Sequence, residues 1–209
     1  MEIYINEERL QLDVADLLNF GQLVQKIETE VLGARGEVLT QIQLNDQNLD
    51  EAAELDHQNL PLSRINKLVI LSASPSDLVL EAMADAPTIL TEMVRVLEEV
   101  LEAFERSEDS KGYQDFIIIT DGLTWFTTIY TRAMAIFQDA ILKASLHQSP
   151  FILESQKLSK TIEEILDCQS TKDRTTFLDL LEYELKPSLQ TLAAEVPAFR
   201  QTLISSFPS

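Results

Sequence analysis

The amino-acid sequence predicts an α+β protein in which a mixed α/β segment is followed by an all-α helical bundle. Apolar residues alternate with polar ones in the first third of the chain, and they recur every three to four residues in the rest. A short stretch rich in serine and proline, at 72–76, separates the two regions. We therefore expect a first domain over residues 1–74 and a bundle of four to five helices over residues 75–209.

The first domain is expected to open with a β-hairpin that is followed by one helix. Residues 1–5 and 10–14 each alternate between apolar and polar side chains, on either side of a short polar stretch. Over 20–32 the apolar residues fall instead on one helical face. Asn19 is placed to cap the start of this helix, and Gly33 is placed to end it in the left-handed conformation.

Two further β segments complete the first domain. The segment 41–50 combines alternation at Ile42 and Leu44 with a cluster of turn-forming residues. After a polar loop, the segment 67–73 has the β-rich composition of a buried strand. The predicted order of elements is therefore β-β-α-β-β.

This order of elements resembles the ubiquitin-like β-grasp fold. The residues that carry the resemblance are the hairpin 1–14, the helix 20–32, the segment 41–50 and the final strand 67–73. The resemblance covers about a third of the chain and implies a role in protein interaction. Ubiquitin-type modifiers end in a Gly-Gly tail, and no Gly-Gly dipeptide occurs in this sequence, so the resemblance does not extend to conjugation.

The rest of the chain is expected to begin with two long helical segments. A broad apolar stripe over 89–104 predicts a helix that has Pro87 in its first turn and ends at the polar stretch 107–112. The segment 113–146 is mostly helical in pattern, and 120–122 is expected to break or kink it.

Two more helices and a short closing helix complete the predicted bundle. One covers about 151–168, the next begins near Thr171 and is kinked by Pro187, and the last follows Pro197. In the earlier segment 113–146, the β-branched run 116–119 is compatible with either a strand or a helix. Short connections between the helices favour an antiparallel arrangement.

The charge balance restricts the partners of the chain. There are 35 acidic residues and 16 basic ones, which gives a formal net charge of −19. Such a surface repels phosphate backbones, so we expect no nucleic-acid partner. It would steer a basic protein partner toward the chain, although the charge is also compatible with a role in solubility alone.

We expect a cytoplasmic protein without membrane association. No apolar run approaches the roughly 18 residues that a membrane span needs, and the first residues lack the features of a signal peptide. The one cysteine, Cys168, excludes an internal disulfide.

The sequence contains no assembled catalytic or cofactor motif. Cys168 follows Asp167, and a neighbouring carboxylate raises the pKa of a thiol, which opposes its activation. Glu54 and His57 have the spacing of a metal-ligand pair, but this pair stands alone. The five glycines build no phosphate-binding loop. We therefore expect no enzymatic activity, no cofactor and no bound metal.

The expected function is that of a protein-interaction or regulatory protein that acts through its surfaces. Four apolar residues of the first domain would form a recognition patch if their side chains point outward from the sheet. Three glutamates on one face of the first bundle helix are interpreted as solvated, or as a contact for a basic partner. These candidate partner-binding residues are Ile42, Leu44, Leu68, Ile70, Glu98, Glu102 and Glu105.

Two other classes of function stay open. A ligand-binding or enzymatic bundle would have a pocket near Trp125, Tyr130 and Tyr183, with Glu184 or Asp121 as its polar group. An assembly or secretion chaperone would instead hold a partner helix in an exposed groove. The oligomeric state stays open as well, and a homo-oligomer is one of the alternatives.

Overall fold

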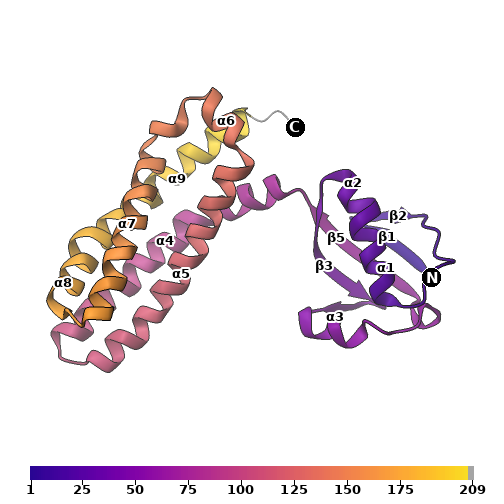
Figure 1. Ribbon diagram of the computed structural model, residues 1–209, viewed down its shortest axis with the longest axis horizontal. Coiled ribbons are helices and arrows are strands. Elements are labelled where there is room, and N and C mark those ends of the chain that lie inside the picture. The colour runs from indigo at the N-terminus through magenta and orange to yellow at the C-terminus, as the bar shows by residue number, and fades with distance from the viewer. Residues whose placement is uncertain (207–209) are drawn as a thin grey trace. The chain divides into compact units, whose positions relative to one another are not determined.

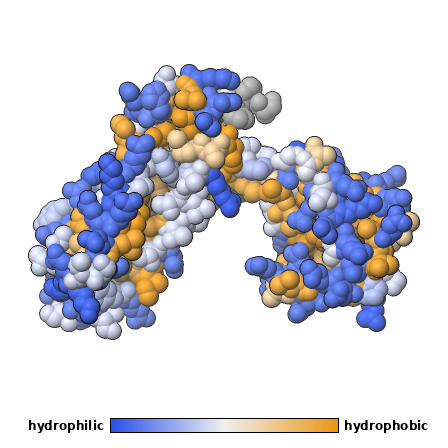
Figure 2. Space-filling model, viewed as in Figure 1, coloured by the Kyte–Doolittle hydropathy of each residue, from blue (hydrophilic) through white to orange (hydrophobic). Residues whose placement is uncertain are grey.

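The chain folds into two compact units, Met1–Leu78 and Val79–Ser209, in a computed structural model that describes residues 1–206 (Figure 1). The first unit holds a mixed sheet and the second holds helices, so the α+β class is confirmed. Each unit has a separate cluster of buried apolar side chains. Figure 2 shows that apolar residues also reach the surface of both units, among mainly hydrophilic neighbours.

The first unit is built around a five-stranded sheet with the order β2-β1-β5-β3-β4. Its central pair, β1 and β5, is parallel, and the other three pairs are antiparallel. The first strand therefore lies beside the last one, in the middle of the sheet. The strands are β1 (Glu2–Ile5), β2 (Glu8–Leu10), β3 (Val38–Leu44), β4 (Gln47–Leu49) and β5 (Lys67–Ala73).

Both hairpins of this sheet turn through two residues with left-handed backbone. The turn residues are Asn6-Glu7 and Asn45-Asp46, with φ values between 46° and 73°. A tight turn of this kind has a twist that matches the twist of the strands it joins. The predicted hairpin at the start of the chain is confirmed, although its second strand ends at Leu10 rather than at residue 14.

A continuous helical segment covers one face of the sheet (Figure 1). It begins as α1 (Phe20–Lys26), continues as the π-helical η1 (Ile27–Leu32) and ends as α2 (Gly33–Arg35). The Asn19 side chain accepts a hydrogen bond from the backbone N–H of Gln22, so the predicted N-cap is confirmed.

The end of this helical segment lies beyond the predicted residue. Gly33 has a φ of −58°, which is an ordinary helical value, and the left-handed residue is Gly36, with a φ of 67°. The prediction that Gly33 ends the helix was therefore wrong. The apolar pattern stops at Leu32, and the helix continues for one more turn that buries no side chain.

The loop expected between the last two strands contains a short helix. This helix, α3 (Glu51–His57), is capped by Asp50, whose side chain accepts a hydrogen bond from the Ala53 N–H. A 3-10 turn, η2 (Leu62–Arg64), follows it. No residue of α3 is buried, and its Leu55 is 61 % exposed, so no apolar stripe indicates the helix in the sequence.

The second unit packs four long helices around one apolar core (Figure 1). Shorter helical segments connect them. No helix within residues 1–206 combines the length and the apolar character that a bilayer span requires. The long helices are α4 (Pro75–Glu105), α5 (Asp109–Ile136), α7 (Pro150–Thr171) and α9 (Lys186–Ser206), and the short ones are α6 (Gln138–Lys143), η3 (Leu146–Gln148), α8 (Arg174–Asp179) and the π-helical η4 (Leu180–Leu185).

Two prolines that were expected at helix starts lie inside long helices instead. Pro87 lies within α4, which begins a dozen residues earlier, where the Ser74 hydroxyl accepts a hydrogen bond from the Asp77 N–H. Pro197 lies within α9 and does not begin a separate closing helix. Each proline removes one backbone hydrogen bond. Buried residues on both sides of each proline pack into the same core, and this packing keeps the helix continuous.

The expected break at 120–122 does not occur, and the run 116–119 is helical, because both stretches lie within α5. A Cβ atom on Gly122 would lie 2.6 Å from the Sδ atom of Met93 in α4. The glycine therefore allows a close contact between two helices, and it does not interrupt the helix that contains it.

Two arginines tie the ends of the bundle together through backbone carbonyls. Arg200 of α9 donates from Nε to the Leu80 carbonyl of α4 at 2.7 Å. Arg174 of α8 donates to the Phe104 carbonyl near the C-terminus of α4 at 2.9 Å, and it lies 3.1 Å from the Asp109 carboxylate. The two contacts join α8 and α9 to opposite ends of α4.

We predict opposite effects of alanine at the two glycines near the end of the helical segment in the first unit. Gly36→Ala should lower the free energy of unfolding by about 1 kcal/mol, because a Cβ atom is strained at a positive φ. Gly33→Ala, the matched control, should raise it by roughly 0.5–1 kcal/mol, because Gly33 is helical and open to a methyl group. Urea denaturation measures both, and equal shifts would contradict this assignment of the helix end.

Candidate functional site

The four apolar residues predicted for a sheet patch belong to the core of the first unit. Ile42, Leu44, Leu68 and Ile70 are exposed by 2 %, 4 %, 0 % and 0 %. Ile42 pairs with Ile70 and Leu44 pairs with Leu68 across β3 and β5, and all four pack with Phe20 of α1. Their side chains point inward, so these residues cannot form the outward recognition patch.

The opposite face of the sheet carries the strand neighbours of these core residues. Tyr4 of β1 lies opposite Val69 of β5, and Gln43 of β3 lies on the other side of Val69. Leu71 lies two residues further along β5 and pairs with Gln41. Because successive side chains of a strand point to opposite faces, these five residues share the face that α1 does not cover. We refer to them as the open sheet face.

The open sheet face has an apolar centre and a charged edge. Leu71 is 40 % exposed, whereas Tyr4 and Val69 are half-buried. At the edge, the Lys67 ammonium lies 3.2 Å from the Asp46 carboxylate and 6.0 Å from the centre of the Tyr4 ring. Exposed ion pairs of this kind add little stability. An apolar centre inside a polar rim is the usual anatomy of a protein–protein interface.

The three glutamates predicted as a contact for a basic partner lie exposed on α4, as a solvated face requires. Two of them already have basic partners. Glu98 lies 2.7 Å from the Lys186 ammonium of α9, and Glu102 lies 3.0 Å from the Arg106 guanidinium. A basic protein that binds here would have to compete with these two cations, whereas Glu105 forms no ion pair within residues 1–206.

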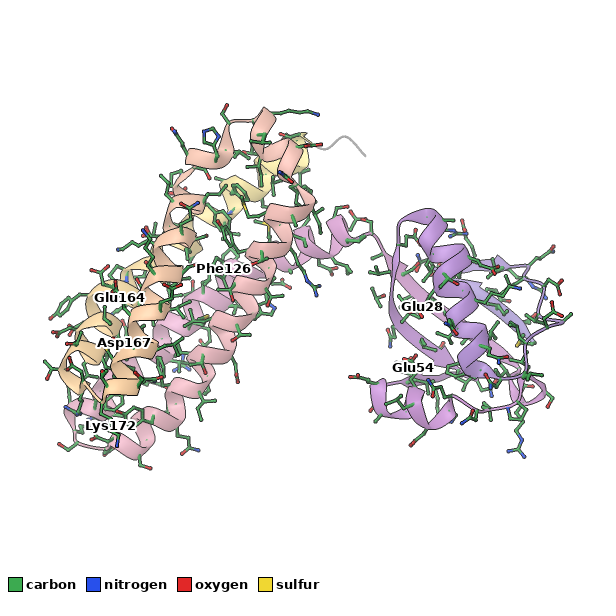
Figure 3. The ribbon with its side chains drawn as sticks, in the orientation of Figure 1. Glu28, Glu54, Phe126, Glu164, Asp167 and Lys172 are labelled. Carbon is green, nitrogen blue, oxygen red and sulfur yellow. The ribbon has the colours of Figure 1, made fainter. Side chains whose placement is uncertain are left out.

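A polar cleft of about 440 Å³ lies between α1 and α3. Asparagine and glutamine side chains provide much of its lining, and its lining residues include no lysine or arginine. Glu28 comes from η1 and Glu54 from α3 (Figure 3). Partial burial raises the pKa of the Glu54 carboxyl above its ordinary value, and the nearby charges of Glu28 and Glu51 raise it further. A cation in this cleft would relieve that repulsion.

A second cleft, of about 510 Å³, lies beside the end of α7. It is lined by Cys168, by two aromatic residues, Tyr113 and Phe177, and by polar residues that include Lys172. Of these residues, Figure 3 labels Lys172. Burial raises the pKa of the Cys168 thiol, and the carboxylates of three neighbouring acidic residues, Asp173, Asp167 and Glu164, raise it further. The effect predicted for Asp167 is therefore confirmed in direction, and the thiol is disfavoured as a nucleophile.

The residues predicted to line a bundle pocket do not share a buried site. Tyr183 is 64 % exposed on η4, and Asp121 is exposed on α5. Glu184 forms an ion pair with Lys157 at 2.8 Å. Trp125 is half-buried and packs against the core of the bundle. This arrangement gives no support to a reaction centre built from these groups.

Of the Glu54 and His57 pair, Glu54 lines the cleft between α1 and α3, whereas His57 is turned toward its own helix. The Nδ1 atom of His57 lies 2.7 Å from the Ala53 carbonyl oxygen, so that ring nitrogen is used within α3. Within residues 1–206, no group of three or more histidine, cysteine, aspartate or glutamate side chains is arranged to hold a metal ion.

Comparison with known proteins assigns the helical unit, and with it the chain, to a family. The family model described as "Domain of unknown function (DUF8042)" matches residues 81–195, which is more than half of the 209 residues. The chain therefore belongs to this family. No curated protein and no solved structure matches the chain.

We predict that neutralising Glu54 stabilises the first unit near neutral pH. A carboxyl whose pKa is raised on folding binds its proton more tightly in the folded state, so stability falls as pH rises from the unfolded pKa through the folded one. Glu54→Gln should raise the unfolding temperature at pH 7 and reduce this fall. Asp56→Asn, on the same helix outside the cleft, is the control. An equal gain in both variants, or none in Glu54→Gln, would show that the cleft does not penalise the charge.

We predict that Cys168 reacts slowly with thiol reagents in the folded protein. Its side chain is buried, and its raised pKa leaves little thiolate at neutral pH. The rate of modification by Ellman's reagent should be at least about tenfold lower than in the same protein unfolded in denaturant. Equal rates in the two states would contradict the burial and the pKa direction described above.

Proposed function

We propose that this chain is a non-catalytic interaction protein whose first unit is a ubiquitin-like β-grasp domain. Three features support the β-grasp assignment. The strands follow the order β2-β1-β5-β3-β4, β1 and β5 are parallel, and a helix packs on one face of the sheet. The function itself is inferred from the open sheet face, since the other face is filled by α1.

The observation that carries the proposal is the in-register row of side chains on β1 and β5. Tyr4 and Val69 lie directly opposite each other, and Leu71 extends the row along β5. The flanking Gln41 and Gln43 are uncharged. Interface centres are depleted of charged residues and enriched in tyrosine, so the composition of this face fits a binding surface.

A basic protein is the partner class that best fits the charge of the chain. A formal net charge of −19 attracts a basic surface over a distance of about one Debye length, roughly 8 Å at physiological salt. The α1–α3 cleft adds two carboxylates, on Glu28 and Glu54, that have no cation among the lining residues. The raised pKa of the Cys168 thiol favours binding over covalent catalysis. We further infer a cytoplasmic location, where a lone thiol stays reduced.

We predict that an arginine at Leu71 abolishes partner binding. The immobilised full-length chain is exposed to an extract of its native host, and retained proteins are quantified by mass spectrometry. Leu71→Arg places a charge in the apolar centre of the open sheet face, so a specific partner should be retained at least about tenfold less. Because Leu71 is 40 % exposed, the fold should persist, which circular dichroism checks.

The matched control is Leu55→Arg, which changes an exposed leucine on α3, outside the open sheet face. This variant should retain the partner as the wild type does. If Leu71→Arg and Leu55→Arg retain the same proteins in the same amounts, or if the wild type retains no specific protein, the proposed function is wrong.

A further inference from the structure

The outward side of α5 is a second surface of low charge. Ile117 and Ile118 are 58 % and 56 % exposed, and Trp125 is half-buried on the same helix. Over its whole length, α5 carries three acidic and two basic residues, whereas α4 carries eight acidic and one basic. The formal charge is therefore −1 for α5 and −7 for α4.

The threonines of α5 offer fewer free hydrogen-bond donors than their number indicates. Each hydroxyl donates to a backbone carbonyl of the preceding turn, at distances of 2.7–2.8 Å. A hydroxyl that is bonded in this way has used its one donor and has no donor left for water or for a partner. The residues are Thr120, Thr124, Thr127, Thr128 and Thr131.

Two opposite charges flank this uncharged stretch. Asp121 and Arg132 are both exposed, and neither forms an ion pair or a side-chain hydrogen bond within residues 1–206. They are 11 residues apart, which is close to three full helical turns, so they lie on the same side of α5, about 16 Å apart. Trp125 and Thr128 lie between them.

We propose that α5 is a self-association surface that pairs antiparallel with α5 of a second copy of this chain. A two-fold axis midway between Asp121 and Arg132 places each Asp121 opposite the second copy's Arg132. The same axis brings Trp125 of one copy next to Thr128 of the other, and Ile118 next to Ala135. The arrangement is self-complementary and closed, as an isologous dimer requires.

Charge favours a second copy over a different occupant. A basic partner would leave Arg132 facing a like charge, and an acidic partner would do the same to Asp121, whereas a second copy pairs both. Two chains that each carry a formal charge of −19 also repel each other, and a helix with a charge of −1 is a side where they can approach with little local repulsion.

The experiment measures the mass of the full-length chain by sedimentation velocity over a range of concentrations. The wild type should dimerise. Asp121→Arg and Arg132→Asp should each raise the dimer dissociation constant at least about tenfold, because each creates two like-charge contacts by symmetry. The double variant, Asp121→Arg with Arg132→Asp, restores both pairs with reversed sign and should recover most of the dimer.

The matched control is Glu163→Arg on the exposed face of α7, which makes the same change of charge elsewhere and should dimerise at least as well as the wild type. A wild type that stays monomeric at the highest concentration measured would overturn the proposal. So would single variants that dimerise normally, or a double variant that associates no better than the single ones. None of these outcomes tests the protein partner proposed for the open sheet face, because α5 and the open sheet face belong to different units.

Discussion

The parallel pairing of β1 with β5 is the constraint on which the first unit depends. It joins residues 2–5 to residues 67–70, so two strands from opposite ends of the unit's sequence are hydrogen-bonded to each other. Because side chains alternate along each strand, the pairing decides which residues face α1 and which face away. With Ile3 and Ile5 inward, Leu68 and Ile70 must also be inward, and Tyr4, Val69 and Leu71 are left on the open sheet face.

This pairing also explains which part of the site could be predicted from the sequence. Alternation in 1–5 predicts the inward residues of β1, because the intervening side chains there are polar or amphipathic. The run 68–71 is apolar at every position, so its composition predicts a strand without showing which side chains face the core. Only the register with β1 and β3 resolves that choice. The segment was therefore located correctly, but the residues named from it were one position away from the exposed ones.

In the helical unit, tertiary packing overrides the local signals that the sequence provides. Prolines and glycines predict interruptions when only their backbone preferences are considered, yet Pro87, Pro197 and Gly122 all lie inside helices. Gly112 shows the reason most clearly, since a Cβ atom there would lie 2.9 Å from the ring of Phe104. The missing side chain provides room for a neighbouring helix. Such a helix–helix contact cannot be predicted from the sequence of one helix alone.

The distribution of charge connects both units to the proposed function. Many cations of the chain are already used within it: Arg95, Arg106 and Lys186 pair with glutamates of α4, and Arg174 and Arg200 hold backbone carbonyls. The acidic residues outnumber the basic ones by about two to one, so the unpaired charge that remains on the surface is mostly negative. A protein can approach such a chain closely only if it is basic or if it contacts a place with few carboxylates. The open sheet face and the outward side of α5 both have few carboxylates, and each combines low charge with exposed apolar side chains. In the function proposed above, the acidic remainder of the surface would act over a longer range and favour basic partners over acidic ones.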